Sequence, residues 1–93
     1  MICSYFLSKG GAFVTVGEAC RKRILELCKD RNITVNKLST VCGITQSTLN
    51  NIVSGRNHSL TISTVKKICD GLNISIIDFF TSDLFENIEQ EIR

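Results

Sequence analysis

The side chains best suited to specific chemistry are short and polar, and they follow Thr45 in the stretch up to Gly55. At the helical repeat of 3.6 residues, five of them share one face of a helix over residues 46–54. They are Gln46, Ser47, Asn50, Asn51 and Ser54. Side-chain amides can pair with the N6 and N7 edge of adenine, and a helix in the major groove of DNA needs such a face. This stretch therefore has the chemistry of base reading.

Catalysis and metal binding have little support in the sequence. There is no Ser/His/Asp arrangement, no glycine-rich phosphate loop and no carboxylate pair on a shared face, and His58 is the one histidine. The five cysteines, at positions 3, 20, 28, 42 and 69, form no C-x-x-C pair. We therefore expect a protein that is not an enzyme, has no catalytic residues, binds no metal and needs no cofactor. Its thiols should be free and buried, as in a cytoplasmic protein.

Charge is distributed unevenly along the chain. Residues 1–67 hold ten of the eleven lysines and arginines and three of the nine acids, which gives +7, whereas residues 68–93 carry −5. A basic body with an acidic tail suits a protein whose body binds a polyanion. Lys37 and the run Arg21–Arg23 are interpreted as solvated faces, with phosphate contact as their alternative role.

Length and periodicity predict one all-α domain. The chain has 93 residues, and no apolar run is long enough for a membrane span. Cys20, Ile24, Leu27 and Cys28 recur at helical spacing within 18–31. Thr34 can cap a second, short helix that carries Leu38, Val41 and Cys42, and Gly43 would end it.

Three more helical segments follow. Thr45 caps the helix over 46–54, which Gly55 ends. Thr61 or Ser63 caps a fourth helix running to about Asp70, which Gly71 would end, with Val65, Ile68 and Cys69 inward. Ser75 and Asp78 resemble a capping box for a short fifth helix with Ile76, Ile77, Phe79 and Phe80 as its apolar residues. An amphipathic pattern then suggests an extra C-terminal helix through Leu84, Phe85, Ile88 and Ile92.

The N-terminal residues allow two interpretations. Cys3–Leu7 and Ala12–Val16 could be short strands of a hairpin around residues 8–11. Alternatively, Lys9-Gly10-Gly11 could be a translated ribosome-binding site, and the natural chain would then start at Val14. Residues 1–16 are accordingly treated as an irregular or hairpin-like extension.

The turn and the helices around it resemble a known family. The residues that carry the resemblance are Leu38, Ser39, Gly43, Ile44, Thr45, Gln46, Ser47, Thr48, Leu49, Ile52, Gly55 and Arg56, followed by the stretch 61–80. They are similar to the lambda-repressor/Cro-like (XRE-type) helix-turn-helix family of bacterial and phage transcriptional regulators. The resemblance implies a compact five-helix DNA-binding domain over residues 17–81. The pattern of the remaining residues, 82–93, is that of an acidic amphipathic segment.

The family's site roles transfer by position. The resemblance implies base contacts by Gln46, Ser47, Asn50 and Asn51. It implies phosphate contacts by Thr34, Asn36, Thr45, Ser54, Arg56 and Asn57. One departure is that Cys28 and Val53 stand where some members have a partly buried Arg–Glu pair, so we expect apolar packing there.

The expected function is that of a sequence-specific transcriptional regulator, most simply a repressor, acting on double-stranded DNA as a homodimer. Leu84, Phe85, Ile88 and Ile92 are the dimer candidates, with closure of the monomer core as their other role. A second hypothesis is an antitoxin-like module of the same fold that binds a toxin or another protein. A third is a purely structural helical protein, which would show no salt-dependent DNA binding.

Overall fold

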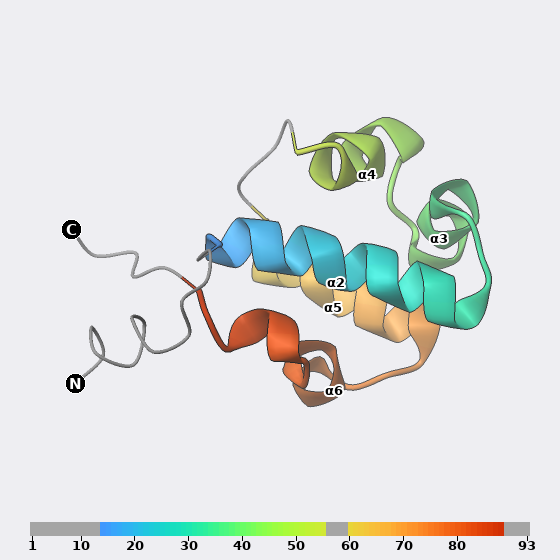
Figure 1. Ribbon diagram of the computed structural model, residues 1–93. Helices are drawn as coiled ribbons and strands as arrows, with labels where there is room; N and C mark the ends of the chain where they lie inside the picture. The colour runs from blue at the N-terminus through green and yellow to red at the C-terminus, as the bar shows by residue number, and fades with distance from the viewer. Residues whose placement is uncertain (1–13, 56–59, 89–93) are drawn as a thin grey trace.

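A computed structural model describes residues 14–55 and 60–88. These residues form five α-helices and a short 3₁₀ helix, η1 (Figure 1). The elements are α2 (Val16–Arg31), α3 (Val35–Cys42), α4 (Gln46–Val53), α5 (Ile62–Leu72), α6 (Ile76–Phe80) and η1 (Asp83–Phe85). Within the described ranges the chain has no β-strand, and the predicted all-α five-helix domain is confirmed.

Each of the five α-helices starts after a serine or threonine whose hydroxyl accepts a backbone N–H three residues on. The caps are Thr15, Thr34, Thr45, Thr61 and Ser75. Such a cap satisfies a backbone donor that the helix leaves unpaired. Thr15 is the one cap that the sequence interpretation missed. Because of it, α2 starts at Val16, so the prediction that Val16 ends a strand is wrong.

The ends of the helices depend on left-handed residues. Gly43 ends α3 with φ 71°, as predicted, whereas Asn32 (φ 56°) and Asn73 (φ 59°) end α2 and α5. The prediction that Gly71 ends the fourth helix is therefore wrong. Gly71 lies inside α5, where an added Cβ would come within 3.0 Å of the Cys42 Cα. Glycine is needed there for close packing between α3 and α5.

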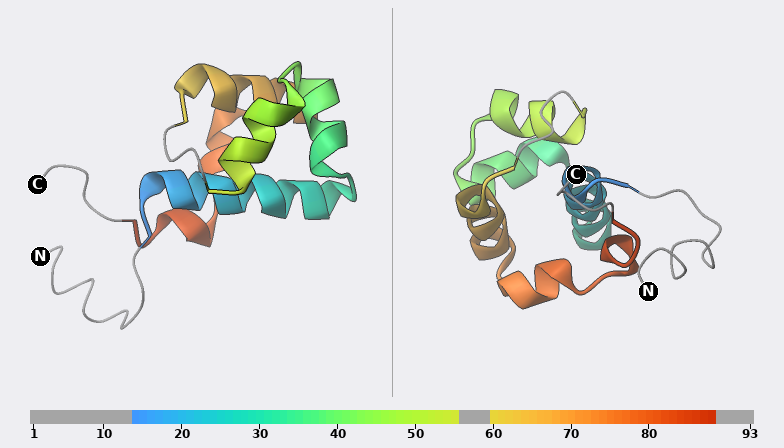
Figure 2. Two further views of the ribbon diagram at one scale, coloured as in Figure 1. Left: turned by 90° about the horizontal axis from the view of Figure 1, so that it is seen from above. Right: turned by 90° about the vertical axis from the view of Figure 1, so that its left-hand side faces the viewer.

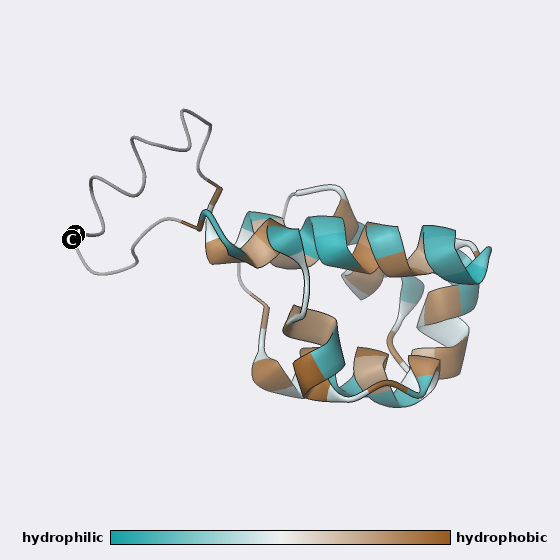
Figure 3. Ribbon diagram, turned by 60° about the horizontal axis from the view of Figure 1, so that its bottom comes forward, coloured by the Kyte–Doolittle hydropathy of each residue, from teal (hydrophilic) through white to brown (hydrophobic). Residues whose placement is uncertain are grey.

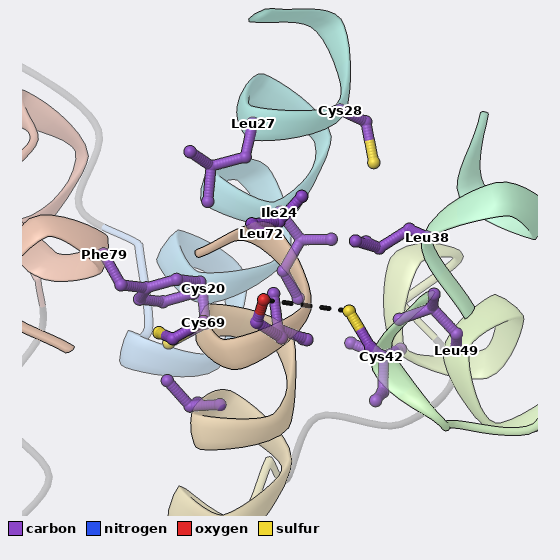
Figure 4. Close-up of a cluster of buried hydrophobic side chains, with 13 residues drawn as sticks. Cys20, Ile24, Leu27, Cys28, Leu38, Cys42, Leu49, Cys69, Leu72 and Phe79 are labelled. Atoms are coloured by element: carbon purple, nitrogen blue, oxygen red, sulfur yellow. Dashed lines mark hydrogen bonds between the residues drawn. The ribbon is translucent and has the colours of Figure 1, made fainter. Parts of the chain in front are cut away.

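The core lies between α2, α3, α4 and α5 and is closed by α6. Its most buried large side chains are Phe79, Ile24, Leu38, Leu49, Ile68 and Val65. Most of these are labelled with their neighbours in Figure 4, where the Cys42 thiol donates to the Ile68 carbonyl oxygen at 3.7 Å. In Figure 3 hydrophilic residues follow the outer face of the long helix α2. Of the apolar residues in α3, Leu38 and Cys42 are buried, whereas Val41 is 43% exposed.

The C-terminal residues pack without the predicted amphipathic helix. The Phe85 ring lies 4.9 Å from that of Phe80, centroid to centroid. After η1 the chain turns, and Ile88 forms an isolated parallel bridge with Val14. Phe85 packs against the rings of Phe79 and Phe80, and Ile88 pairs with Val14. The described residues after α6 therefore do not form a continuous helix. The predicted hairpin residues 3–7 and 12–13, and Ile92, lie outside the described residues.

Candidate nucleic-acid interface

Helices α3 and α4 form a tight helix-turn-helix unit. After Gly43, the Ile44 N–H donates to the Ser39 carbonyl oxygen at 3.0 Å. Leu38 and Leu49 are fully buried on the inner sides of the two helices. The hydrogen bond in the turn and the burial of Leu49 together fix the orientation of α4 relative to the core. Figures 1 and 2 place α4 at the surface, on the side opposite α6.

The outward face of α4 holds the polar side chains that the sequence placed there. Gln46, Ser47 and Asn50 are exposed, and Asn51 is half-buried. Ile52 faces the opposite way and is 4% exposed. Three of the four predicted base-contact residues are thus exposed on one face, and Asn51 is half-buried beside them.

The N-terminal ends of α3 and α4 are the places where a phosphate could bind. The Thr45 hydroxyl accepts the Thr48 N–H at 3.3 Å, and the Thr34 hydroxyl accepts the Lys37 N–H at 3.0 Å. Asn36 is exposed in the first turn of α3. Neither first turn contains an acidic residue, so no carboxylate within these turns offsets the positive ends of the two helix dipoles. Both ends can therefore attract an anion.

The end of α4 is only partly described. Ser54 is exposed, and its hydroxyl donates to the Asn51 carbonyl oxygen at 3.3 Å. The predicted phosphate contacts Arg56 and Asn57, like His58, lie outside the described residues.

Two arginines interpreted as solvated are engaged in the fold. Arg23 donates to the carbonyl oxygens of Phe79, at 2.6 Å, and Asp78, at 2.7 Å. Arg21 pairs with Glu18 and donates to the Val53 carbonyl oxygen at 3.3 Å. Each arginine is three residues from a glutamate, and this spacing predicts an ion pair within α2. The spacing does not predict the carbonyl partners of the two arginines, which are distant in the sequence.

The described cysteines are unsuited to nucleophilic chemistry. Cys20, Cys28, Cys42 and Cys69 are buried and free. Burial raises the pKa of the Cys42 thiol to about 11, with smaller contributions from the thiols of Cys28 and Cys69. Such thiols stay protonated at neutral pH and are poor nucleophiles. Within residues 14–55 and 60–88, no group of three or more potential ligand side chains could hold a metal ion.

Two further sequence features can be located in the fold. Cys28 is buried in the core and Val53 packs against the core, as expected for the departure from an Arg–Glu pair. No helix among the described residues is long and apolar enough to cross a membrane.

Comparisons with known proteins agree with this geometry. The family model described as "Cro/C1-type HTH DNA-binding domain" matches residues 23–83. A solved structure titled "Crystal structure of the prophage Lp1 protein 11" is similar, with a TM-score of 0.69 and 38% identity. The similarity covers 76% of this chain and 93% of that one. A search of curated proteins gives no match. The helix-turn-helix unit, its caps and the matched range lead to one conclusion: this chain belongs to the family of Cro/C1-type helix-turn-helix DNA-binding domains.

Proposed function

We propose that this DNA-binding protein is a sequence-specific transcriptional regulator that inserts α4 into the major groove of double-stranded DNA. The observation that carries the proposal is the outward face of α4, where Gln46, Ser47 and Asn50 are exposed. Asn51 completes the set of base-contact residues. Short polar side chains on a rigid surface helix can approach base edges without a desolvation cost for a buried charge.

The composition of this face favours A·T base pairs. It has amides and a hydroxyl but no lysine or arginine, the side chains that most often read guanine. Gln46 and Asn51 are the main candidate readers, because each can donate to N7 and accept from N6 of adenine. We therefore expect A·T-containing half-sites.

Phosphate contacts would flank this face and set its register on DNA. We assign them to Thr34 and Asn36 at the start of α3, and to Thr45 and Ser54 at the two ends of α4. Arg56 and Asn57 complete the set from the segment after α4. Removing Arg56 should weaken binding to all sequences similarly and flatten the salt dependence.

A homodimer on an inverted repeat would bring enough base contacts together for specificity. We assign the dimer contact to Leu84, Phe85, Ile88 and Ile92. Leu84 and Ile88 are half-buried in the monomer, so each keeps apolar surface for a second copy. Phe85 packs on Phe80 and would support the contact from within. Bound at a promoter, such a dimer would repress by occupying the DNA that polymerase needs.

The test is selection of bound sequences from random duplexes, with protein starting at Met1 and at Val14. Enrichment of an A·T-containing inverted repeat, lost in a Gln46→Ala/Asn51→Ala variant, is the expected result. Binding that is weak, salt-sensitive and without an enriched sequence would contradict it. In that case affinity capture with a neighbouring toxin gene product would test the antitoxin hypothesis.

A further inference from the structure

The C-terminal end of α4 is held by a side chain from α2. Nη1 of Arg21 donates to the carbonyl oxygen of Val53, the last residue of α4, at 3.3 Å. The last turn of α4 has no basic residue of its own. Since the carbonyls at a helix C-terminus carry partial negative charge, Arg21 supplies the cation that α4 lacks.

Glu18 orients this arginine. Nε of Arg21 donates to Oε1 of Glu18 at 3.2 Å, and Nη2 pairs with the other carboxylate oxygen. The side chains are only 24% and 30% exposed. Glu18 lies in the first turn of α2, where its N–H donates to the Thr15 cap at 3.1 Å. Because Arg21 contacts both carboxylate oxygens of Glu18, its guanidinium is restricted to one orientation.

The two ends of α4 are therefore held in different ways. The first end follows the turn at Gly43 and is fixed by the Thr45 cap, whose hydroxyl accepts the Thr48 N–H. The last turn is followed by Gly55, with φ 86°, and contains Asn50 and Asn51. An anchor at Val53 acts directly on the backbone of this last turn.

We propose that Arg21, oriented by Glu18, is a positioning residue for DNA reading, which holds the last turn of α4 so that Asn50 and Asn51 face the base edges. The inference rests on the proposed function for its DNA consequence, but not for the anchoring itself.

The first test compares Arg21→Met with Lys22→Met. Both variants remove one positive charge and keep an apolar stem, and Lys22 is exposed with no hydrogen bond or ion pair to the described residues. For Arg21→Met we expect the ratio of random-duplex to selected-duplex Kd to fall about tenfold, typical of a lost charged hydrogen bond. The flattened base preferences should be those read by Asn50 and Asn51. Equal ratios for the two variants would overturn the proposal.

The second test is amide hydrogen exchange without DNA. The N–H groups of Ser54 and Gly55 donate to the carbonyls of Asn50, at 2.9 Å, and Ile52, at 3.2 Å. In Arg21→Met these two amides should exchange faster while those of α5 keep their rates. Uniform acceleration across the protein would show a merely structural role and refute the proposal.

Two further outcomes remain decisive. If the wild-type protein selects no sequence, the proposed function fails, and the exchange experiment alone decides the anchoring role. If Arg21→Met does not fold, Glu18→Gln replaces it, because this variant keeps Arg21 and removes the carboxylate charge that orients it. Smaller shifts in the same direction support the proposal, and unchanged values in the folded Glu18→Gln protein overturn it.

Discussion

At the scale of single residues, Asn51 lies between the exposed polar face of α4 and the core. It is half-buried at the edge of the core, and its amide is the main candidate reader in the last turn of α4. If it pairs with a base, replacing it with alanine should weaken binding to the selected duplex by about 1–3 kcal/mol and relax one position of the site. Fluorescence anisotropy with selected and random duplexes measures both. Equal losses on the two duplexes would contradict base reading by Asn51.

Arg23 shows how one charged side chain can link distant helices. Its guanidinium lies over the end of α6, where the carbonyls of Asp78 and Phe79 accept its N–H groups, and its side chain is 12% exposed. Arg23→Ala would remove the donor to the Phe79 carbonyl and one of the two donors to the Asp78 carbonyl, which also accepts the Thr81 N–H at 3.2 Å. We expect a loss of about 2–3 kcal/mol in the free energy of unfolding.

Urea denaturation measures this loss, and Lys22→Ala is its control. Lys22 is the exposed neighbour of Arg23 on α2, so its removal should change stability by less than about 0.5 kcal/mol. A similar cost for the two variants would show that the contacts with α6 contribute little.

At the scale of elements, the packing of α3 on α5 depends on Gly71. A Cβ there would come within 3.0 Å of both the Cys42 Cα and the Val41 carbonyl oxygen, and closer still to the Cys42 sulfur. Alanine gains about 1 kcal/mol of helix propensity over glycine. Overpacking against a neighbouring backbone typically costs about 1–3 kcal/mol, so we expect Gly71→Ala to be net destabilising.

Thermal unfolding of Gly71→Ala and Ser63→Ala separates the gain in helix propensity from the cost of overpacking. Ser63 is on the exposed side of α5, where alanine adds propensity without meeting a neighbour. Ser63→Ala should therefore leave Tm unchanged or raise it, whereas Gly71→Ala should lower it. A raised Tm for Gly71→Ala would mean that α3 moves away from α5 at little cost.

At the scale of the whole molecule, the buried thiols make stability depend on alkaline pH. Burial raises the pKa of Cys42 from 9.0 to about 11, and it also raises the pKa values of Cys20, Cys28 and Cys69. Above pH 9 the unfolded chain loses these protons while the folded protein keeps them. The stabilisation present below pH 9 is therefore lost as pH rises toward 11.

Urea denaturation at pH 7, 9, 10 and 11 should show this fall in the free energy of unfolding. Cys42→Ala removes the thiol with the most raised pKa, so its stability should decline less steeply over the same range. Parallel curves for the two proteins would show that ionisation of Cys42 does not contribute.

The amino-acid sequence alone determined the helices and the outward face of α4. Thr34, Thr45 and Ser75 each cap a helix by bonding an N–H three residues away, and such local interactions can be read from spacing. The polar face of α4 follows from the helical repeat in the same way. The sequence also contained the cap at Thr15, which the interpretation overlooked.

Only the tertiary structure decided which residues hold these helices together. Arg21 reaches a carbonyl 32 residues away, and Arg23 reaches one 56 residues away. Gly71 is required by the approach of Cys42, and Val41 is exposed although Leu38 and Cys42 of the same helix are buried. Caps and periodicity act within one or two helical turns, whereas these contacts depend on how the helices pack. Packing joins residues far apart in the chain, and no local pattern specifies which of them will meet.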